Sequence, residues 1–414
     1  MPLRTHVALT IAGVSLLGCV TEGPRRPAAS ASPDAAGPLA PVARPADAAR
    51  VSTSRVVVSV APAGAVGYDG QSLPIVSPDG RFLAVQEGDP PPWPTLLADP
   101  SATPAHTSRL AVYDLAEPIA RRVEWPEQPP MGLVAGRGAD STGVLVEWPR
   151  EDGARWIGRL LWLSGQVQWL VTGDTVNAHA AWTADSRLVY TRRGVADLPE
   201  ATHLVVLNAD GSESTRRAAG GAYAFPLTTS DASVVYALVR TPSGTDIEAV
   251  RMLADTPHSP ARLGSTLARR TVSRRPEPAM GFQITAPVQT APPRTGAGSP
   301  DPALFYHPDL ARMVTFEARE SSFGLLAPRS IAAVRWTHGG ADGYLCTTPE
   351  GLVFTPTPPA PSGEEARRAP DVRVIAGHFV PRATDDAARP VLLVGPQGKD
   401  PTTLVLMRLS PEAP

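Results

Sequence analysis

The residues best suited to recognise a charged partner are four arginines in the Pro- and Ala-rich segment 265–301, namely Arg269, Arg270, Arg274 and Arg275. Clustered guanidinium groups suit an acidic protein or an anionic polymer. The same segment carries Phe282, and a second long segment, 87–107, carries Trp93. These residues are a candidate binding rim. The alternative is that both segments are solvated surface without a partner.

Asn177 and His179 stand in the stretch VNAHAAW, directly before an apolar run, and complete the candidate rim. The sequence has no Gly-x-Ser-x-Gly, no His-Glu-x-x-His and no His pair at metal-ligand spacing, and VGPQGKDP lacks the pattern of a phosphate loop. We therefore predict no catalytic residue, no metal and no cofactor. A catalytic site built from residues far apart in the sequence stays open as the alternative.

Short β hairpins must position these residues. In VSPDGRFLAV, residues 76–85, Pro78 presets φ, Asp79 caps its own backbone and Gly80 tolerates a positive φ, which is typical of a tight turn. Similar turns before β runs occur at Asp140, Asp185, Asp231, Asp309 and Asp386. The spacings from Asp140 to Asp185 and on to Asp231 are 45 and 46 residues, the length of one four-stranded propeller blade.

A second pair of β runs follows most of these turns, so the repeat predicts an all-β chain: a six-bladed β-propeller of four-stranded antiparallel blades. The fifth blade combines the turn at Asp309 with the run SIAAVRW, residues 330–336. A seventh blade near residues 280–285 is the alternative count. The last blade lacks a fourth strand, and we expect the unpaired run 54–60 to supply it beside 403–410, which closes the ring.

The repeats VSPDGRFLAV and HAAWTADSRLVYTRR resemble those of the TolB family, and the resemblance extends over about residues 54–410. It implies a propeller built from such repeats. TolB itself carries an α/β domain before its propeller, whereas a Pro/Ala-rich segment occupies that position here. The partner of that family is therefore not carried over.

The N-terminus carries an apolar run, residues 7–17, that is too short to span a bilayer and is typical of a signal peptide. It ends in Leu16-Leu17-Gly18-Cys19, which resembles the bacterial lipoprotein box. The resemblance implies a signal peptide over 1–18 and lipidation of Cys19, and more than one acyl chain gives stable anchoring. The alternative is an ordinary signal peptide. Val20, where Asp would mark inner-membrane retention, favours the periplasmic face of the outer membrane.

Residues 19–50 are rich in Pro and Ala and predict a disordered tether, followed by the propeller over 51–414. The net charge of −2 argues against nucleic acid as a partner, and we expect a monomer. The long segments are all predicted at the end of the blades opposite the Asp turns. We expect a lipid-anchored, non-enzymatic module that binds an envelope protein or an anionic polymer. The alternative is a propeller enzyme with a site at the channel mouth, such as a lactonase-like or glycan-acting hydrolase.

Overall fold

The computed structural model describes β strands over most of the chain from residue 49 onwards. The described residues are 49–52, 57–67, 74–77, 79–88, 109–116, 120–183, 185–229, 231–254, 259–274, 284–285, 302–307, 309–330, 332–338, 341–348, 351–356, 378–380, 391–397 and 400–411. Cys19, the predicted signal peptide and most of the predicted tether lie outside them. All described residues belong to the unit formed by residues 44–414.

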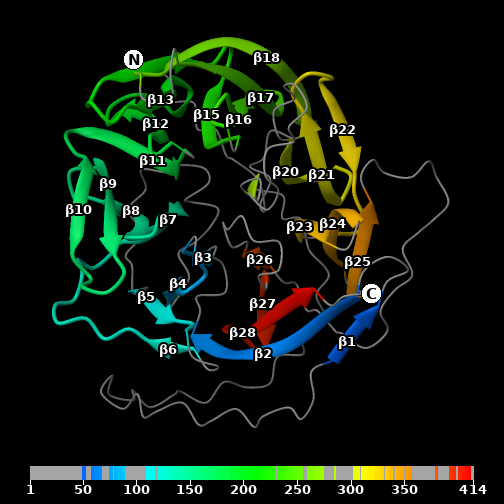
Figure 1. Cartoon of the computed structure of the whole chain (residues 1–414). Helices are drawn as coiled ribbons and strands as arrows, with labels where there is room; N and C mark the ends of the chain where they lie inside the picture. Colours follow the sequence, from blue (N-terminus) through cyan, green and yellow to red (C-terminus); the bar gives the residue numbers. More distant parts are fainter. Residues whose placement is uncertain are drawn as a thin grey trace, which may run out of the picture. The chain divides into compact units, whose positions relative to one another are not determined.

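The prediction of an all-β fold is confirmed, because the helical content of the described residues is one short 3-10 helix, η1 (Pro199–Ala201). The part of the chain that the structure describes contains no helix long and apolar enough to cross a membrane. Nearly all strand pairs are antiparallel neighbours in the sequence, as Figure 1 shows by the gradual change of colour from strand to strand.

The first three groups of strands cover residues 75–217. The first is β3–β4–β5–β6 (Ile75–Val76, Phe82–Glu87, Arg109–Asp114, Arg121–Arg122). The second is β7–β8–β9–β10 (Val134–Ala139, Gly143–Pro149, Arg155–Leu161, Val167–Val171). The third is β11–β12–β13–β14 (Thr175–Trp182, Leu188–Gly194, His203–Leu207, Glu213–Arg217). One parallel contact, Val176 beside Arg155, joins the second and third groups into an eight-stranded sheet.

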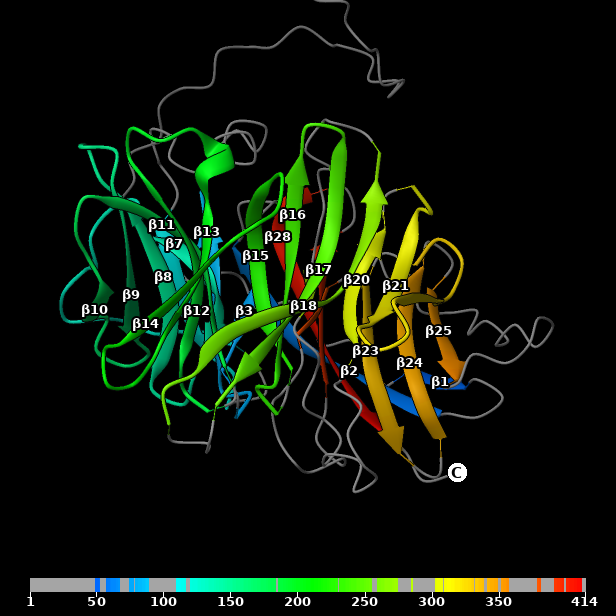
Figure 2. The ribbon, with the colours of Figure 1, turned by 90° about the horizontal axis from the view of Figure 1, so that it is seen from above.

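Three more groups cover residues 222–356. Figure 2 shows β15–β16–β17–β18 side by side (Ala222–Thr228, Val234–Thr241, Gly244–Leu253, Arg262–Ser273). The next group is β19–β20–β21–β22 (Ile284–Thr285, Ala303–His307, Arg312–Glu317, Ser322–Leu325). A three-stranded sheet then follows, β23–β24–β25 (Ala332–His338, Ala341–Thr348, Gly351–Pro356).

The predicted fifth repeat was wrong in its strand assignment. The run SIAAVRW does not join the sheet that contains the turn at Asp309, because β22 already pairs with β21 there. Most of that run instead forms the first strand of the three-stranded sheet β23–β25. Residues 284–285 form an edge strand beside β20 and not a sheet of their own. With the eight-stranded sheet counted as two groups, the described residues form seven groups of strands.

The seventh group combines the two ends of the described chain. Its order is β1–β2–β28–β27–β26 (Ala49–Ser52, Val57–Gly67, Asp400–Pro411, Val391–Gln397, His378–Val380). The blue strand β2 lies antiparallel to the red strand β28 in Figure 1, with Val60 opposite Leu409 and Gly67 opposite Thr403. Pro62, which has no N–H to donate, lies where the register shifts, and a bulge tolerates such a residue inside a sheet.

The recurring turn between the first and second strand of a group has a common hydrogen-bonding pattern. The hydroxyls of Ser77, Thr183 and Thr229 each donate to the Asp two residues later. The residue after that Asp has a positive φ: 68° at Gly80, 65° at Ser186 and 53° at Ala232. The side-chain oxygens accept backbone N–H groups that the tight turn leaves without strand partners. The positive φ predicted for Gly80 is therefore confirmed.

The carboxylate of Asp231 makes the stability of its turn depend on pH. Burial raises the pKa of Asp231, but hydrogen bonds from Thr229 and Ser233 outweigh that effect and hold the pKa below its ordinary value. Its stabilisation is therefore complete above the pKa of an unfolded Asp, about 3.9, and is lost as the pH falls through the lower folded pKa.

We expect Asp231→Asn to destabilise the fold by about 1 kcal/mol at pH 7, because the charged acceptor of these hydrogen bonds is lost. The difference in stability between the variant and the wild type should become smaller below pH 4. Thermal melts at pH 7 and pH 3 measure this, with the exposed Asp174→Asn as a control for the loss of one charge. An equal difference in melting temperature at both pH values would contradict stabilisation of the turn by the charged carboxylate.

The hydrophobic core lies between successive groups of strands. One cluster joins β15–β18 to β20 and β21, with the rings of Tyr236 and Phe316 in edge contact at 6.1 Å between centroids. Similar clusters join the first group to the second, the second to the third, the third to the fourth, and β20–β21 to β23–β24. Each inner sheet is therefore covered on both faces by its neighbours in the sequence, which explains its long buried runs.

Candidate binding site

The structure separates the predicted rim residues. Asn177 and His179 lie on β11, Arg269 and Arg270 lie on β18, and Arg274 follows β18. Trp93, Arg275 and Phe282 lie outside the described residues, as does most of the segment 87–107. Among the described residues, Asn177 and His179 come from one short stretch of β11, and Arg269 and Arg270 are consecutive on β18.

Arg269 and Arg270 do not lie in a loop, as the sequence suggested, but in the edge strand β18. Neighbouring residues of a strand point to opposite faces, so the two side chains diverge. Arg269 is held within the protein: its Nε lies 2.7 Å from Asp246 Oδ2 on the neighbouring strand β17, and its Nη1 donates to the carbonyl of Ala219, between β14 and β15, at 2.8 Å. Arg270 and Arg274 are exposed. The arginines therefore do not form one cationic patch on β18.

Asn177 is fully buried and links two groups of strands. Its Nδ2 donates to the carbonyl of Arg155 on β9 at 3.0 Å, and its Oδ1 accepts from Nε of Arg192 at 2.9 Å. Because the amide is used on both sides, Asn177 positions β11 beside β9 and does not face a ligand.

His179 sits at a bulge of β11, where the pairing with β12 shifts between Ala178 and Ala181. Its φ is 58°, which is uncommon for a residue with a side chain. Phe225 has a φ of 52° at the corresponding shift in β15, so the bulge is a repeated feature of the fold. The two rings contact each other at 4.1 Å between centroids. The bulge turns both side chains toward the boundary between the two sheets.

The Thr191 hydroxyl determines which imidazole nitrogen of His179 carries the proton. The hydroxyl donates to the carbonyl of Ala178 at 3.0 Å and lies 3.1 Å from Nδ1 of His179. Since the hydroxyl proton is already used, we assign Nδ1 as the donor in this contact. In the neutral ring the lone pair then belongs to Nε2.

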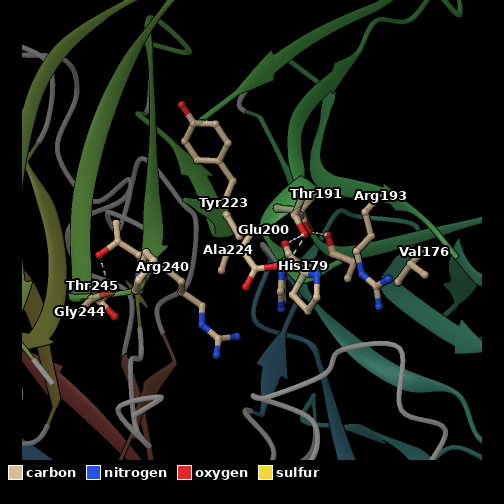
Figure 3. Close-up of a pocket in the computed structure, with 16 residues that line it drawn as sticks. Val176, His179, Thr191, Arg193, Glu200, Tyr223, Ala224, Arg240, Gly244 and Thr245 are labelled. Carbon is tan, nitrogen blue, oxygen red and sulfur yellow. Dashed lines mark hydrogen bonds between the residues drawn. The ribbon is translucent and has the colours of Figure 1, made fainter. Parts of the chain in front are cut away.

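A cavity of about 300 Å³ opens between the third and fourth groups of strands, and His179 lines it (Figure 3). It lies at the end of the sheets opposite the Asp turns, which we call the far end. Its volume is at the lower limit for small-ligand sites. The lining is apolar and hydroxyl-bearing, with three charged groups: Val176, Ala178, His179, Thr191, Arg193, Pro199, Glu200, Thr202, Ala222, Tyr223, Ala224, Arg240, Thr241, Pro242, Gly244 and Thr245.

Arg240 supplies a cation to this cavity. It lies near the end of β16, opposite Thr245 of β17, and Figure 3 shows its guanidinium projecting into the space between the two sheets. Burial lowers the pKa of Arg240, and the nearby negative charge of Glu200 only partly offsets this. The positive charge is therefore held where water solvates it poorly, a setting in which an anion is attracted strongly.

Arg193 builds one wall of the cavity. Its side chain is buried, and Nη1 donates to the carbonyls of Gly194 and Asp197, the latter at 2.8 Å. The Asp197 carboxylate in turn accepts the N–H of Gly194 at 2.9 Å. These bonds shape the turn that leads into η1 and places Glu200 at the rim. Arg193 thus acts mainly as a support for the wall.

Neither metal chemistry nor a reactive thiol stands out in the described part of the chain. No group of three or more His, Cys, Asp or Glu side chains gathers there. Cys346 is fully buried, and burial raises the pKa of its thiol to about 11, which leaves it protonated at neutral pH.

Sequence reasoning found His179 but missed Arg193, Glu200 and Arg240. The four residues come from different elements. His179 lies on β11, Arg193 lies on β12, Glu200 lies in η1 and Arg240 lies on β16. The one available signal for Arg240 was its place after the buried run VVYALV, directly before the turn TPSG.

No family model and no curated protein match this sequence. Among solved structures, a protein assigned as TolB from Agrobacterium tumefaciens is 13% identical, with 82% of this chain and 90% of that chain covered and a TM-score of 0.36. The WD40 domain of coronin from Toxoplasma gondii is 8% identical, with 88% and 89% covered and a TM-score of 0.48. A puromycin-hydrolyzing peptidase from Mycobacterium tuberculosis is 14% identical, with 84% and 57% covered and a TM-score of 0.39.

These similar structures comprise both enzymes and non-enzymes and do not determine a function. The similarity concerns the fold alone. The description of the fold given above rests on the strand pairing of this chain.

Proposed function

We propose that the chain is a seven-bladed β-propeller. Seven groups of strands follow one another in the sequence, and each inner group packs against the next. Two further contacts support a closed ring: β23 touches β26, and β2 of the last group touches β4 of the first. A single blade cannot cover its own faces, whereas a ring covers all of them. The pairing of β2 with β28 supplies the closing strand.

We further propose that the propeller is a non-enzymatic binding module that recognises an envelope protein or an anionic polymer at its far end. The cavity beside Arg240 is the observation that carries this proposal. It combines one poorly solvated cation with apolar and hydroxyl-bearing walls, a lining suited to recognition. The runner-up is an enzyme that uses Nε2 of His179 as a general base, for which the Thr191 contact to Nδ1 is the supporting observation.

Partner capture tests this function. Photo-crosslinking groups placed at exposed far-end positions Leu198 and Glu200 should trap a defined envelope component, while the same group at exposed Leu163, next to the turn at the opposite end of β9, should not. Equal labelling at all three positions would contradict far-end recognition. Release of alcohol or amine from ester and amide substrates, lost in His179→Gln, would favour the enzyme.

The membrane attachment is proposed from the sequence. Cys19 would become the lipidated N-terminus after removal of residues 1–18, and the segment 19–50 would hold the propeller away from the bilayer at the periplasmic face of the outer membrane.

We expect Cys19→Ser to shift the protein from the membrane fraction to the soluble envelope fraction, because an unlipidated chain lacks the acyl anchor. Fractionation and intact mass measurement test this. The matched control is Cys346→Ser, which should remain in the membrane fraction with its lipid mass retained. Wild-type protein without an added lipid mass would overturn the proposed anchor.

A further inference from the structure

We propose that three tryptophans at the far end of the second group of strands bind an arginine side chain of a protein partner. They are Trp148, Trp156 and Trp169, on β8, β9 and β10, and we call them the tryptophan cage. This inference rests on the proposed binding function, and it names the side chain through which the partner is held.

The pairing of the strands brings the three rings together on one face of the sheet. Trp148 lies opposite Trp156, and Trp169 lies opposite Gly158, two residues further along β9. Residues two apart on a strand share a face. Gly158 leaves the space that Trp169 needs, because a Cβ there would lie 2.9 Å from Cε3 of that indole. All three tryptophan side chains are partly exposed.

The rings of the cage combine faces and edges. Trp148 and Trp169 stack with 5.3 Å between ring centroids, and Trp156 stands nearly perpendicular to both, at 5.9 and 5.5 Å. The indole N–H groups of Trp148 and Trp156 donate to the carbonyls of Met131 and Gly173, at 3.1 and 2.9 Å. Because these bonds hold two of the rings in place, the cage is formed before a ligand arrives.

The protein itself shows which group the cage accepts. The guanidinium carbon of Arg150 lies 4.2 Å from the ring centroid of Trp156 and 5.4 Å from that of Trp148. The negative face of an indole attracts a cation, and a planar guanidinium also stacks on it. An arginine of a partner presents the same group, whereas the ammonium of a lysine is more strongly hydrated and gains less from the contact.

Arg150 is held weakly enough to be displaced. Its ion pair with Asp152 spans 3.3 Å, and the two side chains are 31% and 57% exposed. Ion pairs and cation–π contacts contribute little where water reaches them. Arg150 therefore occupies the cage in the free protein and leaves it when the arginine of the partner enters. Asp152 then pairs with the new guanidinium.

The charges beside the cage favour a cation. The turn that joins β8 to β9 carries Arg150, Glu151 and Asp152, and Asp174 follows Gly173 in the next connection. Glu151, Asp152 and Asp174 are exposed, so these two connections carry one positive and three negative charges. Such a rim attracts a cationic side chain. At this site it favours the protein partner of the proposed function over the anionic polymer.

Exposed apolar side chains lie beside the cage. Met131, whose carbonyl accepts the indole N–H of Trp148, is exposed, and so is Val195. Val195 lies against the turn after Arg150, because a Cβ at Gly153 would be 3.1 Å from its Cγ1. An aromatic and arginine contact with apolar surroundings is typical of the residues that contribute most to a protein interface.

Titration of the purified full chain with N-acetylarginine methylamide tests the inference, with the indole N–H signals followed by NMR. The arginine probe should shift the signals of the three cage tryptophans and saturate. The citrulline counterpart, a neutral urea of nearly the same shape, should bind about tenfold more weakly. Citrulline binding as tightly as arginine would overturn the inference, because the charge would then play no part. Tighter binding of tetramethylammonium than of the arginine probe would overturn the assignment to an arginine side chain.

Removal of the internal occupant gives the sharpest result. Arg150→Ala should tighten binding of the arginine probe severalfold, because the probe no longer displaces a side chain. Arg81→Ala is the matched control and should leave the affinity unchanged. Arg81 also lies over an aromatic ring, that of Phe82, and pairs with Asp114, but it follows a turn at the opposite end of the first group. Weaker binding in Arg150→Ala would overturn the displacement of Arg150.

Variants of the cage itself test the role of the rings. Trp156→Leu should weaken the arginine probe about tenfold, since it keeps an apolar side chain and loses the negative ring face. Trp156→Phe should weaken it less, because a phenyl ring attracts a cation less strongly than an indole. Unchanged affinity in Trp156→Leu, with an unchanged melting curve, would overturn the inference.

Partner capture separates failure of this inference from failure of the proposed function. A partner that is trapped at Leu198 and uses the cage should no longer be captured in Trp156→Leu. Capture at the wild-type level in that variant would overturn only the inference. Saturable binding of the arginine probe without any captured partner would overturn only the recognition of a macromolecule.

Discussion

Removal of residues 49–67 should unfold the propeller as a whole. Those residues contain β1 and β2, and β2 lies between β1 and the 12-residue strand β28 in the last sheet. Without β2, one complete edge of β28 loses its backbone partners, and the contact of the last sheet with β4 is lost as well. Because every sheet depends on its neighbours for burial, we expect loss of the cooperative transition and not a small shift in its midpoint.

Urea unfolding followed by tryptophan fluorescence measures this effect. The matched control begins at residue 49, so it lacks the predicted tether and retains both strands, and it should unfold like the full mature chain. A gentler variant is Val60→Pro, which removes one N–H from an interior strand and should destabilise by about 1–3 kcal/mol, because a carbonyl of the sheet loses its donor. A chain without 49–67 that unfolds with the parent midpoint would rule out closure by β2.

Loss of one partner of the buried ion pair between Glu147 and Arg155 should be the most damaging single substitution outside the hydrophobic core. The side chains are only 8% and 7% exposed, and Arg155 Nη1 lies 3.1 Å from Glu147 Oε2. Glu147 Oε1 also accepts the N–H of Ala180, which ties β8 to the bulge in β11. Among the described groups, Nε and Nη2 of Arg155 have no hydrogen-bond partner, so Glu147 is its main compensation.

We expect Glu147→Leu to destabilise by about 3–5 kcal/mol, because it leaves an uncompensated buried guanidinium. The double variant Glu147→Leu with Arg155→Leu should recover most of that loss, since two apolar residues need no compensation. Denaturant midpoints measure both. Asp152→Asn is the control: it breaks the exposed Arg150–Asp152 pair and should change the midpoint little. A double variant as unstable as the sum of the two single variants would contradict the coupling.

The turns were readable from the sequence because their chemistry is local. Asp79, Asp185 and Asp231 each form a turn with the Ser or Thr two residues earlier, and those contacts need no distant residue. The relation between β2 and β28 could also be inferred, since each end of the repeat pattern had one β run without a partner. The sequence did not reveal which sheet would take the run SIAAVRW, because an apolar strand pairs with any neighbour that offers a suitable edge.

The strand at Arg269 illustrates why other features were hidden. β18 shifts its register against β17 at three places, so its apolar residues do not follow the period of two that identifies a strand. By itself, the sequence determined the all-β class and the turns at Asp79, Asp185 and Asp231, since each depends on residues close together. The tertiary structure alone decided the cavity, where His179, Glu200 and Arg240 meet, because packing between two sheets brings them together.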